Sequence, residues 1–156
     1  MAKTKRTNEE RIVARIALVR ASYEKARKDR SKTSDYRYLR SVLRAYEYFD
    51  QNDLVDNLAE IAPCVLMASV RSGQHAVRTI IDASCDDDDL RMRSRWTRAL
   101  EYALTRNVAA NDLLRFLRAN NGIAGCADLA SKTQSKSSRR RPLYFVKPRL
   151  TILRLC

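Results

Sequence analysis

Apolar side chains recur along most of this chain at steps of three and four residues, the spacing of one face of an α-helix. The pattern predicts three amphipathic helices, over residues 9–29, 35–49 and 90–107. Asn8 precedes the first helix and is expected to cap it. The expected buried faces comprise Ile12, Ile16, Val19, Tyr23 and Ala26; Tyr38, Leu39, Val42, Ala45, Tyr46 and Phe49; and Met92, Trp96, Ala99, Leu100, Ala103 and Leu104.

The segment between the second and third of these helices has a different pattern. Residues 54–72 are apolar on nearly every side, which predicts a helix in the middle of a bundle. Pro63 lies inside this segment and is expected either to begin a new helix or to kink the existing one, because proline lacks a backbone N–H. Residues 74–84 then predict a further short helix that buries Val77, Ile80 and Ile81.

Residues 109–131 predict two short helices joined by a glycine turn. Asn111 is expected to cap the first helix, residues 120–122 form the turn, and the second helix covers residues 123–130. This order is the outline of a helix-turn-helix. The second helix offers few side chains that could read a base edge, so an antiparallel hairpin that closes the bundle is the better interpretation.

The composition also favours helices. The 156 residues include only three glycines and three prolines, too few for the turns of sandwiches, barrels and hairpins. We therefore expect an all-α protein, a compact bundle of about five to six helices with a basic, partly extended C-terminal tail. The predicted organisation is a basic N-terminal arm over residues 1–8, a helical domain over 9–130 and the tail over 131–156. The apolar, β-prone residues after 142 favour docking of the tail or a strand-like conformation.

The formal net charge of +13 is concentrated at the two ends of the chain. Residues 1–30 carry ten Lys or Arg against four Asp or Glu, residues 31–130 carry thirteen against fourteen, and residues 131–156 carry eight against none. Arginine outnumbers lysine by 23 to 8, and its planar guanidinium binds phosphate or carboxylate at two points. A near-neutral body with two cationic ends indicates a protein that meets a polyanion.

Arginines also form two rows on predicted helices, and each row includes a tyrosine. One row lies opposite the buried face of the helix 35–49, and the other lies opposite that of the helix 90–107. Guanidinium groups pair with phosphates, and tyrosine rings stack on unpaired bases. With the basic residues of the tail, the rows make up the predicted nucleic-acid-binding set: Arg37, Arg40, Arg44, Tyr48, Arg91, Arg95, Arg98, Tyr102, Lys136, Arg139, Arg140 and Arg141.

Four consecutive aspartates, residues 86–89, stand directly before the helix 90–107. Carboxylates at a helix N-terminus accept hydrogen bonds from unpaired backbone N–H groups and oppose the positive end of the helix dipole. Consecutive helical residues point in different directions, so four in a row do not converge on one ion. We therefore interpret these aspartates as capping residues and expect no metal site.

The sequence gives little sign of catalysis. His75 is the only histidine, the four cysteines lack the spacing of a zinc site, and three glycines do not build a phosphate-cradling loop. We expect neither enzymatic activity nor a cofactor. The opening residues lack the apolar run of a secretory signal, and the chain holds no apolar run long enough for a bilayer. A cytoplasmic protein with reduced thiols and no membrane contact is therefore expected.

These features favour a nucleic-acid-binding helical module that contacts the phosphate backbone of DNA or RNA through its arginine rows and terminal arms. The alternative is a protein-binding adaptor or inhibitor, such as a mobile element could encode, that meets an acidic or ribonucleoprotein partner. Residues 143–155 would then supply part of the protein contact. A third class, a structural component of an RNA–protein assembly, also fits a neutral body with basic extensions.

Overall fold

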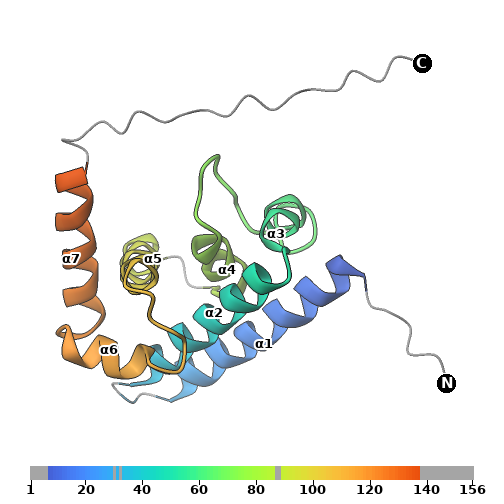
Figure 1. Ribbon diagram of the computed structural model, residues 1–156. Coiled ribbons are helices and arrows are strands. Elements are labelled where there is room, and N and C mark those ends of the chain that lie inside the picture. The colour runs from blue at the N-terminus through green and yellow to red at the C-terminus, as the bar shows by residue number, and fades with distance from the viewer. Residues whose placement is uncertain (1–6, 30, 32, 87–88, 138–156) are drawn as a thin grey trace.

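The computed structural model describes the backbone of residues 7–29, 31, 33–86 and 89–137, and the side chains of these residues up to Thr133. The described residues form seven helices and no strand (Figure 1): α1 (Asn8–Lys28), α2 (Ser34–Gln51), α3 (Val55–Ile61), α4 (Ala76–Ser84), α5 (Leu90–Thr105), α6 (Leu113–Ala119) and α7 (Gly122–Ser137). The all-α prediction is confirmed, with a helix count slightly above the expected five to six. None of the described helices has both the length and the apolar character that a membrane crossing needs.

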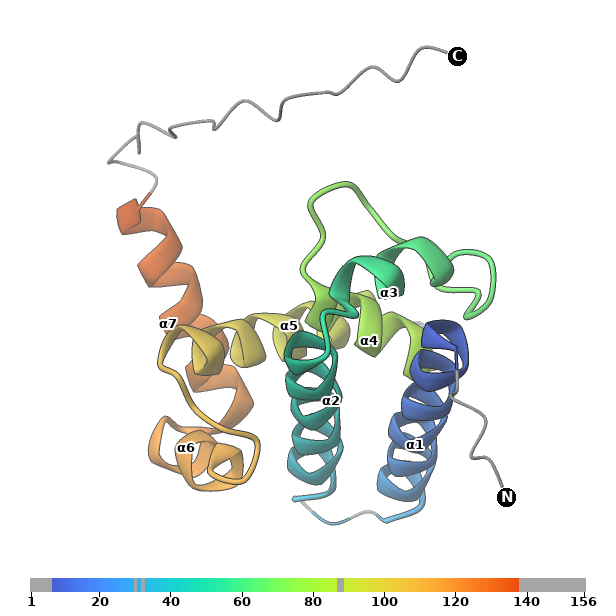
Figure 2. The same cartoon turned by 45° about the vertical axis from the view of Figure 1, so that its right-hand side comes forward.

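α1 and α2 are the two longest helices, and they lie side by side along one side of the bundle (Figures 1 and 2). Both bury the predicted apolar stripes, because positions three and four residues apart share one helix face. The cap of α1 is Thr7, and the prediction of Asn8 was wrong. The Thr7 hydroxyl accepts from the Glu10 N–H at 3.2 Å, and the Glu10 carboxylate accepts from the Thr7 N–H at 2.8 Å. This reciprocal pair is a capping box.

Tyr38 of α2 lies at the centre of the core. Its ring packs against Tyr23 of α1 and Trp96 of α5, each with a centroid distance of 5.2 Å. Its hydroxyl hydrogen-bonds to the Ser84 hydroxyl of α4 at 2.9 Å, and Ser84 in turn donates to the carbonyl of Ile80 at 2.7 Å. Burial raises the pKa of Tyr38, so the phenol stays neutral. One side chain thus joins four helices.

The prediction of a helix over residues 54–72 was wrong after Ile61, where α3 ends. Residues 62–66 form turns and residues 67–75 form an irregular loop. Pro63 explains the end of the helix, because it has no N–H to continue the ladder. The apolar residues of this segment are also not all buried: Val65 is 42% exposed and Met67 is 85% exposed. We refer to residues 62–75 as the α3–α4 loop.

α6 and α7 complete the bundle beside α5, which α7 crosses at a steep angle and contacts closely (Figures 1 and 2). The predicted turn is present, and Gly122 in it has a φ of +77°. A Cβ atom there would lie 2.6 Å from the Tyr36 hydroxyl, so a larger residue would strain the backbone and displace the Tyr36 side chain. α7 continues through Ser137, so residues 131–137, which were assigned to the tail, are helical. The predictions for the tail after 142 lie outside the described residues.

Candidate nucleic-acid interface

Three adjoining hollows in the surface are formed by α4, α5, the α3–α4 loop and one residue of α1. Two of them have a volume of about 640 Å³ each and the third about 380 Å³. Ser94 of α5 lines all three, which makes them one continuous surface. We call the arginines of this surface the arginine track: Arg20, Arg71, Arg78, Arg91, Arg93, Arg95 and Arg98.

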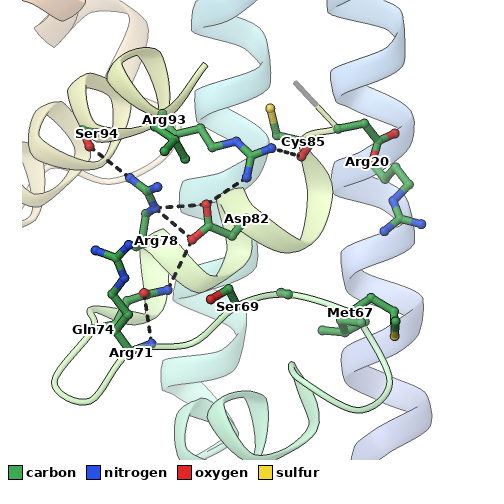
Figure 3. A pocket seen from close by; sticks show the side chains of 14 residues that line it. Arg20, Met67, Ser69, Arg71, Gln74, Arg78, Asp82, Cys85, Arg93 and Ser94 are labelled. Carbon is green, nitrogen blue, oxygen red and sulfur yellow. Dashed lines mark hydrogen bonds and ion pairs between the residues drawn. The ribbon is translucent and has the colours of Figure 1, made fainter. Parts of the chain in front are cut away.

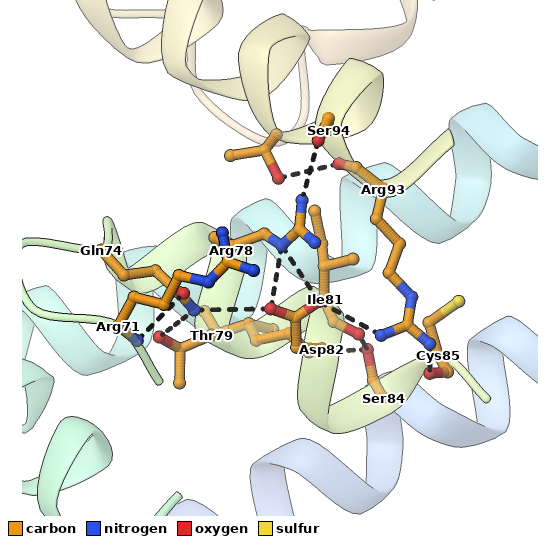
Figure 4. Close-up of polar contacts among 12 residues, drawn as sticks. Arg71, Gln74, Arg78, Thr79, Ile81, Asp82, Ser84, Cys85, Arg93 and Ser94 are labelled. Carbon is orange, nitrogen blue, oxygen red and sulfur yellow. Dashed lines mark hydrogen bonds and ion pairs between the residues drawn. The ribbon is translucent and has the colours of Figure 1, made fainter. Parts of the chain in front are cut away.

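Asp82 of α4 organises the buried part of the arginine track (Figures 3 and 4). Arg78 Nε donates to its two carboxylate oxygens at 3.0 and 2.8 Å, and Arg93 Nη1 donates to one of them at 3.3 Å. Gln74 Nε2 adds a donor at 3.4 Å. The side chains are 20% exposed in Arg78, 13% in Arg93 and 10% in Asp82. A single carboxylate therefore holds two largely buried guanidinium groups.

Further hydrogen bonds fix the direction of these side chains. Arg78 Nη1 donates to the Ser94 hydroxyl at 3.2 Å, and Arg93 Nη2 donates to the Cys85 carbonyl at 2.8 Å. Burial lowers the pKa of Arg93, but the nearby Cys85 and Asp82 raise it by more, so that the pKa lies above its ordinary value. Arg93 is therefore charged at neutral pH.

Arg71 differs from Arg78 because it lies in a loop and is exposed. Its backbone N–H donates to the Gln74 side-chain oxygen at 3.3 Å. Its guanidinium lies beside that of Arg78, as Figures 3 and 4 both show. Arg20 lies at the opposite end of the hollow that Asp82 lines and donates to the Ala83 carbonyl at 2.8 Å.

The predicted row on α5 forms the exposed part of the track. Arg91, Arg95 and Arg98 are all exposed. Arg98 donates to the Ser131 hydroxyl of α7 at 3.1 Å, which keeps its guanidinium next to that helix. Within the described part of the chain, no ion pair joins these three arginines to a carboxylate. The three arginines of this row are therefore on the surface, as the sequence predicted.

The predicted row on α2 lies elsewhere. Arg37, Arg40 and Arg44 line a separate groove of about 370 Å³ with Lys25 of α1. No residue of this groove lines any of the three hollows that carry the arginine track. Arg37 forms an exposed ion pair with Asp29 at 3.3 Å. Arg44 donates to the Asn111 side chain at 2.7 Å. The prediction that Asn111 caps α6 was wrong, since the residue before α6 is Asp112. The two rows thus form two surfaces.

The two tyrosines predicted to stack on bases have other contacts, and their placement on open surfaces was wrong. Tyr102 is only 7% exposed, because α6 packs Phe116 against its ring at a centroid distance of 5.8 Å. Tyr48 is half-buried, and the guanidinium of Arg15 lies 4.0 Å from its ring centroid. Its hydroxyl accepts from Arg11 Nε at 3.1 Å. The buried ring of Tyr102 is therefore not open to a base, and Arg15 already packs on the ring of Tyr48.

The acidic run and the histidine have structural roles. Asp89 caps α5, since its carboxylate accepts from the N–H groups of Arg91 and Met92 at 2.9 and 3.0 Å. This confirms the capping prediction at Asp89, whereas residues 87–88 lie outside the described residues. His75 caps α4, and its Nδ1 accepts from the Val77 N–H at 3.2 Å. In the described residues, no three His, Cys, Asp or Glu side chains gather as metal ligands would.

Sequence reasoning missed four members of the track: Arg20, Arg71, Arg78 and Arg93. The one available signal was the spacing of Arg78 and Asp82, which suits an ion pair one helical turn apart. Of the predicted tail residues, Lys136 lies in α7, where only the backbone is described, and Arg139, Arg140 and Arg141 lie outside the described residues. Comparison with known families, curated proteins and solved structures gives no match to this chain.

Proposed function

We propose that this protein binds nucleic acid, and that the arginine track is its main contact with the phosphate backbone. The observation that supports the proposal is the charge of this surface. Its described lining holds seven arginines against three carboxylates, those of Asp82, Asp86 and Glu101. Such an excess of guanidinium groups on one continuous, hollowed surface suits a polyanion better than a neutral partner.

The geometry suits a phosphate chain. Arg91, Arg95 and Arg98 follow one another along about 10 Å of helix, given a rise of about 1.5 Å per residue. Their guanidinium groups are exposed, so they lose little on leaving water and can release the counterions of the phosphates that they meet. Arg78 and Arg93 are held in place by their ion pairs with Asp82, so their positive charges have fixed positions next to the exposed row.

The contact that we propose carries little base specificity. Tyr102 is buried, Tyr48 is half-buried against Arg15, and arginine contacts with phosphates fix position without reading sequence. The basic residues of the tail, eight Lys or Arg after residue 130, add further charge to the same interaction. We therefore expect affinity that depends steeply on salt and weakly on sequence.

The test is fluorescence anisotropy with labelled single- and double-stranded oligonucleotides over a series of salt concentrations. The variant combines Arg91→Gln, Arg95→Gln and Arg98→Gln, and its matched control combines Arg37→Gln, Arg40→Gln and Arg44→Gln. Each removes three exposed or half-exposed arginines from one helix. The α5 variant should make the slope of log K against log salt shallower by about 2 to 3, the loss of three phosphate contacts. Equal effects of the two variants, or no salt-dependent binding by the unchanged protein, would contradict the proposal.

A protein partner is the second candidate, and one observation favours it. Met67 and Leu90, 85% and 61% exposed, line one of the two hollows of about 640 Å³ together with its arginines. Apolar side chains next to guanidinium groups suit an acidic segment with apolar anchors. Met67→Ser and Leu90→Ser separate the two candidates, because these substitutions would weaken a protein partner and leave oligonucleotide affinity unchanged.

A further inference from the structure

Arg71 and Arg78 form a pair that the exposed α5 row does not explain. They come from the α3–α4 loop and from α4, and both line the two hollows of about 640 Å³. Their guanidinium groups lie next to each other in both close views (Figures 3 and 4). The two positively charged guanidinium groups repel each other, and the repulsion is strongest where the surface is concave and water is partly excluded.

Asp82 balances only part of this charge. Both of its oxygens accept from Arg78, and one of them also accepts from Arg93. Gln74 Nε2 donates to the same carboxylate, so its acceptor sites are largely used. The guanidinium of Arg71 donates to no side chain or carbonyl within the described part of the chain. Arg71 lines both hollows of about 640 Å³, where an anion could accept from its guanidinium.

Ser94 supplies a third group at the same place. Its hydroxyl oxygen accepts from Arg78 Nη1 at 3.2 Å, which leaves the hydroxyl hydrogen able to donate to a ligand. Ser94 also lies where the two larger hollows meet the exposed row of α5. A group bound between Arg71, Arg78 and Ser94 would therefore sit at the end of the exposed row.

We infer that Arg71, Arg78 and Ser94 form a site for a phosphate monoester, and that it receives the terminal phosphate of a nucleic-acid strand. The inference rests on the proposed function, which it extends from the backbone to the end of the strand. A monoester carries a charge of about −1.5 to −2 at pH 7 and three terminal oxygens, enough for the guanidinium of Arg71, the Nη2 group of Arg78 and a hydroxyl. A backbone diester carries a single charge, so it gains less from a concave site. A hollow of about 640 Å³ also leaves room for the attached nucleotide.

The experiment compares two oligonucleotides of the same sequence, one with a 5′-phosphate and one with a 5′-hydroxyl, on the full chain by anisotropy. The phosphorylated strand should bind at least about tenfold more tightly, as expected for hydrogen bonds to a charged group. Arg71→Gln should reduce this ratio to near one. Arg95→Gln is the matched control, since Arg95 is also exposed but lies away from the pair. This substitution should lower the affinity for the two strands by the same factor.

Arg71 is the residue to change first because its exposed side chain has no role in the core. Arg78→Gln tests the same site, with circular dichroism as a check on folding, since it leaves Asp82 short of a partner. Equal affinity of the unchanged protein for the two strands would overturn the inference while leaving the proposed function standing. A ratio that survives Arg71→Gln would also overturn it.

Inorganic phosphate distinguishes a failure of the site from a failure of the proposed function. If neither strand binds, the proposed function fails, and the site is then decided by titrating the protein with phosphate and recording the arginine Nε–H signals by NMR. A saturable shift of the Arg71 and Arg78 signals supports a phosphate site that serves a free phosphate compound. Unchanged signals overturn the site as well.

Discussion

Asp82→Asn is expected to lower the free energy of unfolding by about 2 to 3 kcal/mol. The carboxylate is 10% exposed and receives Arg78, Arg93 and Gln74. Removing one partner of a buried ion pair costs about 3 to 5 kcal/mol, because the other charge is left uncompensated. The lower figure applies here because Arg78 and Arg93 keep a hydroxyl and a carbonyl acceptor, and because an asparagine oxygen still accepts one of the donors.

Urea denaturation at pH 7, followed by circular dichroism, measures this loss. Asp112→Asn is the matched control, since it removes the carboxylate of an ion pair with Arg115 in which the two side chains are 57% and 86% exposed. That pair should contribute less than about 0.5 kcal/mol. A loss for Asp82→Asn as small as that of the control would refute the reasoning, because it would mean that Arg78 and Arg93 are well solvated without their carboxylate.

Three further predictions concern the core. Tyr38→Phe should lower the free energy of unfolding by about 1 kcal/mol, since a buried hydrogen bond is lost while its serine partner keeps a backbone acceptor; urea denaturation checks this. Burial raises the pKa of Cys126 to about 11 from an ordinary 9.0, so the free energy of unfolding should fall as the pH rises through that range. At pH 8 a thiol reagent should label the exposed Cys64 in the folded protein and should label Cys126 only after unfolding. Mass spectrometry of the labelled protein checks this. Gly122→Ala should cost at least about 1 kcal/mol, because φ is +77° and a tyrosine hydroxyl would lie 2.6 Å from the new Cβ; an unchanged melting temperature would contradict this.

The helices with a clear apolar stripe could be predicted from the sequence. Ile12, Ile16 and Val19 recur at helical spacing, and this local pattern is sufficient to place α1. The exposed row on α5 follows in the same way, because residues opposite a buried stripe face solvent. Local periodicity is thus sufficient to predict where these helices lie and on which face of a helix an arginine row stands.

The α3–α4 loop and the buried part of the site could not be predicted. An apolar run such as the one around Met67 does not show which of its residues are buried: here Ala62 and Ala68 join the core, whereas Met67 is exposed and lines a hollow. Arg20 and Arg93 line that hollow although they are far apart in sequence, and only the packing of α1, α4 and α5 brings them there. Likewise, Tyr102 follows the helical spacing of the exposed arginines, but α6 covers it.

The hydrogen bond of the Tyr38 hydroxyl helps to fix the position of the arginine track on the surface. Ser84, its partner, ends α4, and the same short helix carries Arg78 and Asp82. The Arg78 guanidinium is therefore preorganised by the interior, and a ligand of the proposed site would not have to spend its own free energy on ordering it. A conservative change deep in the core should then reduce ligand affinity through misalignment of the arginines, without any loss of surface charge.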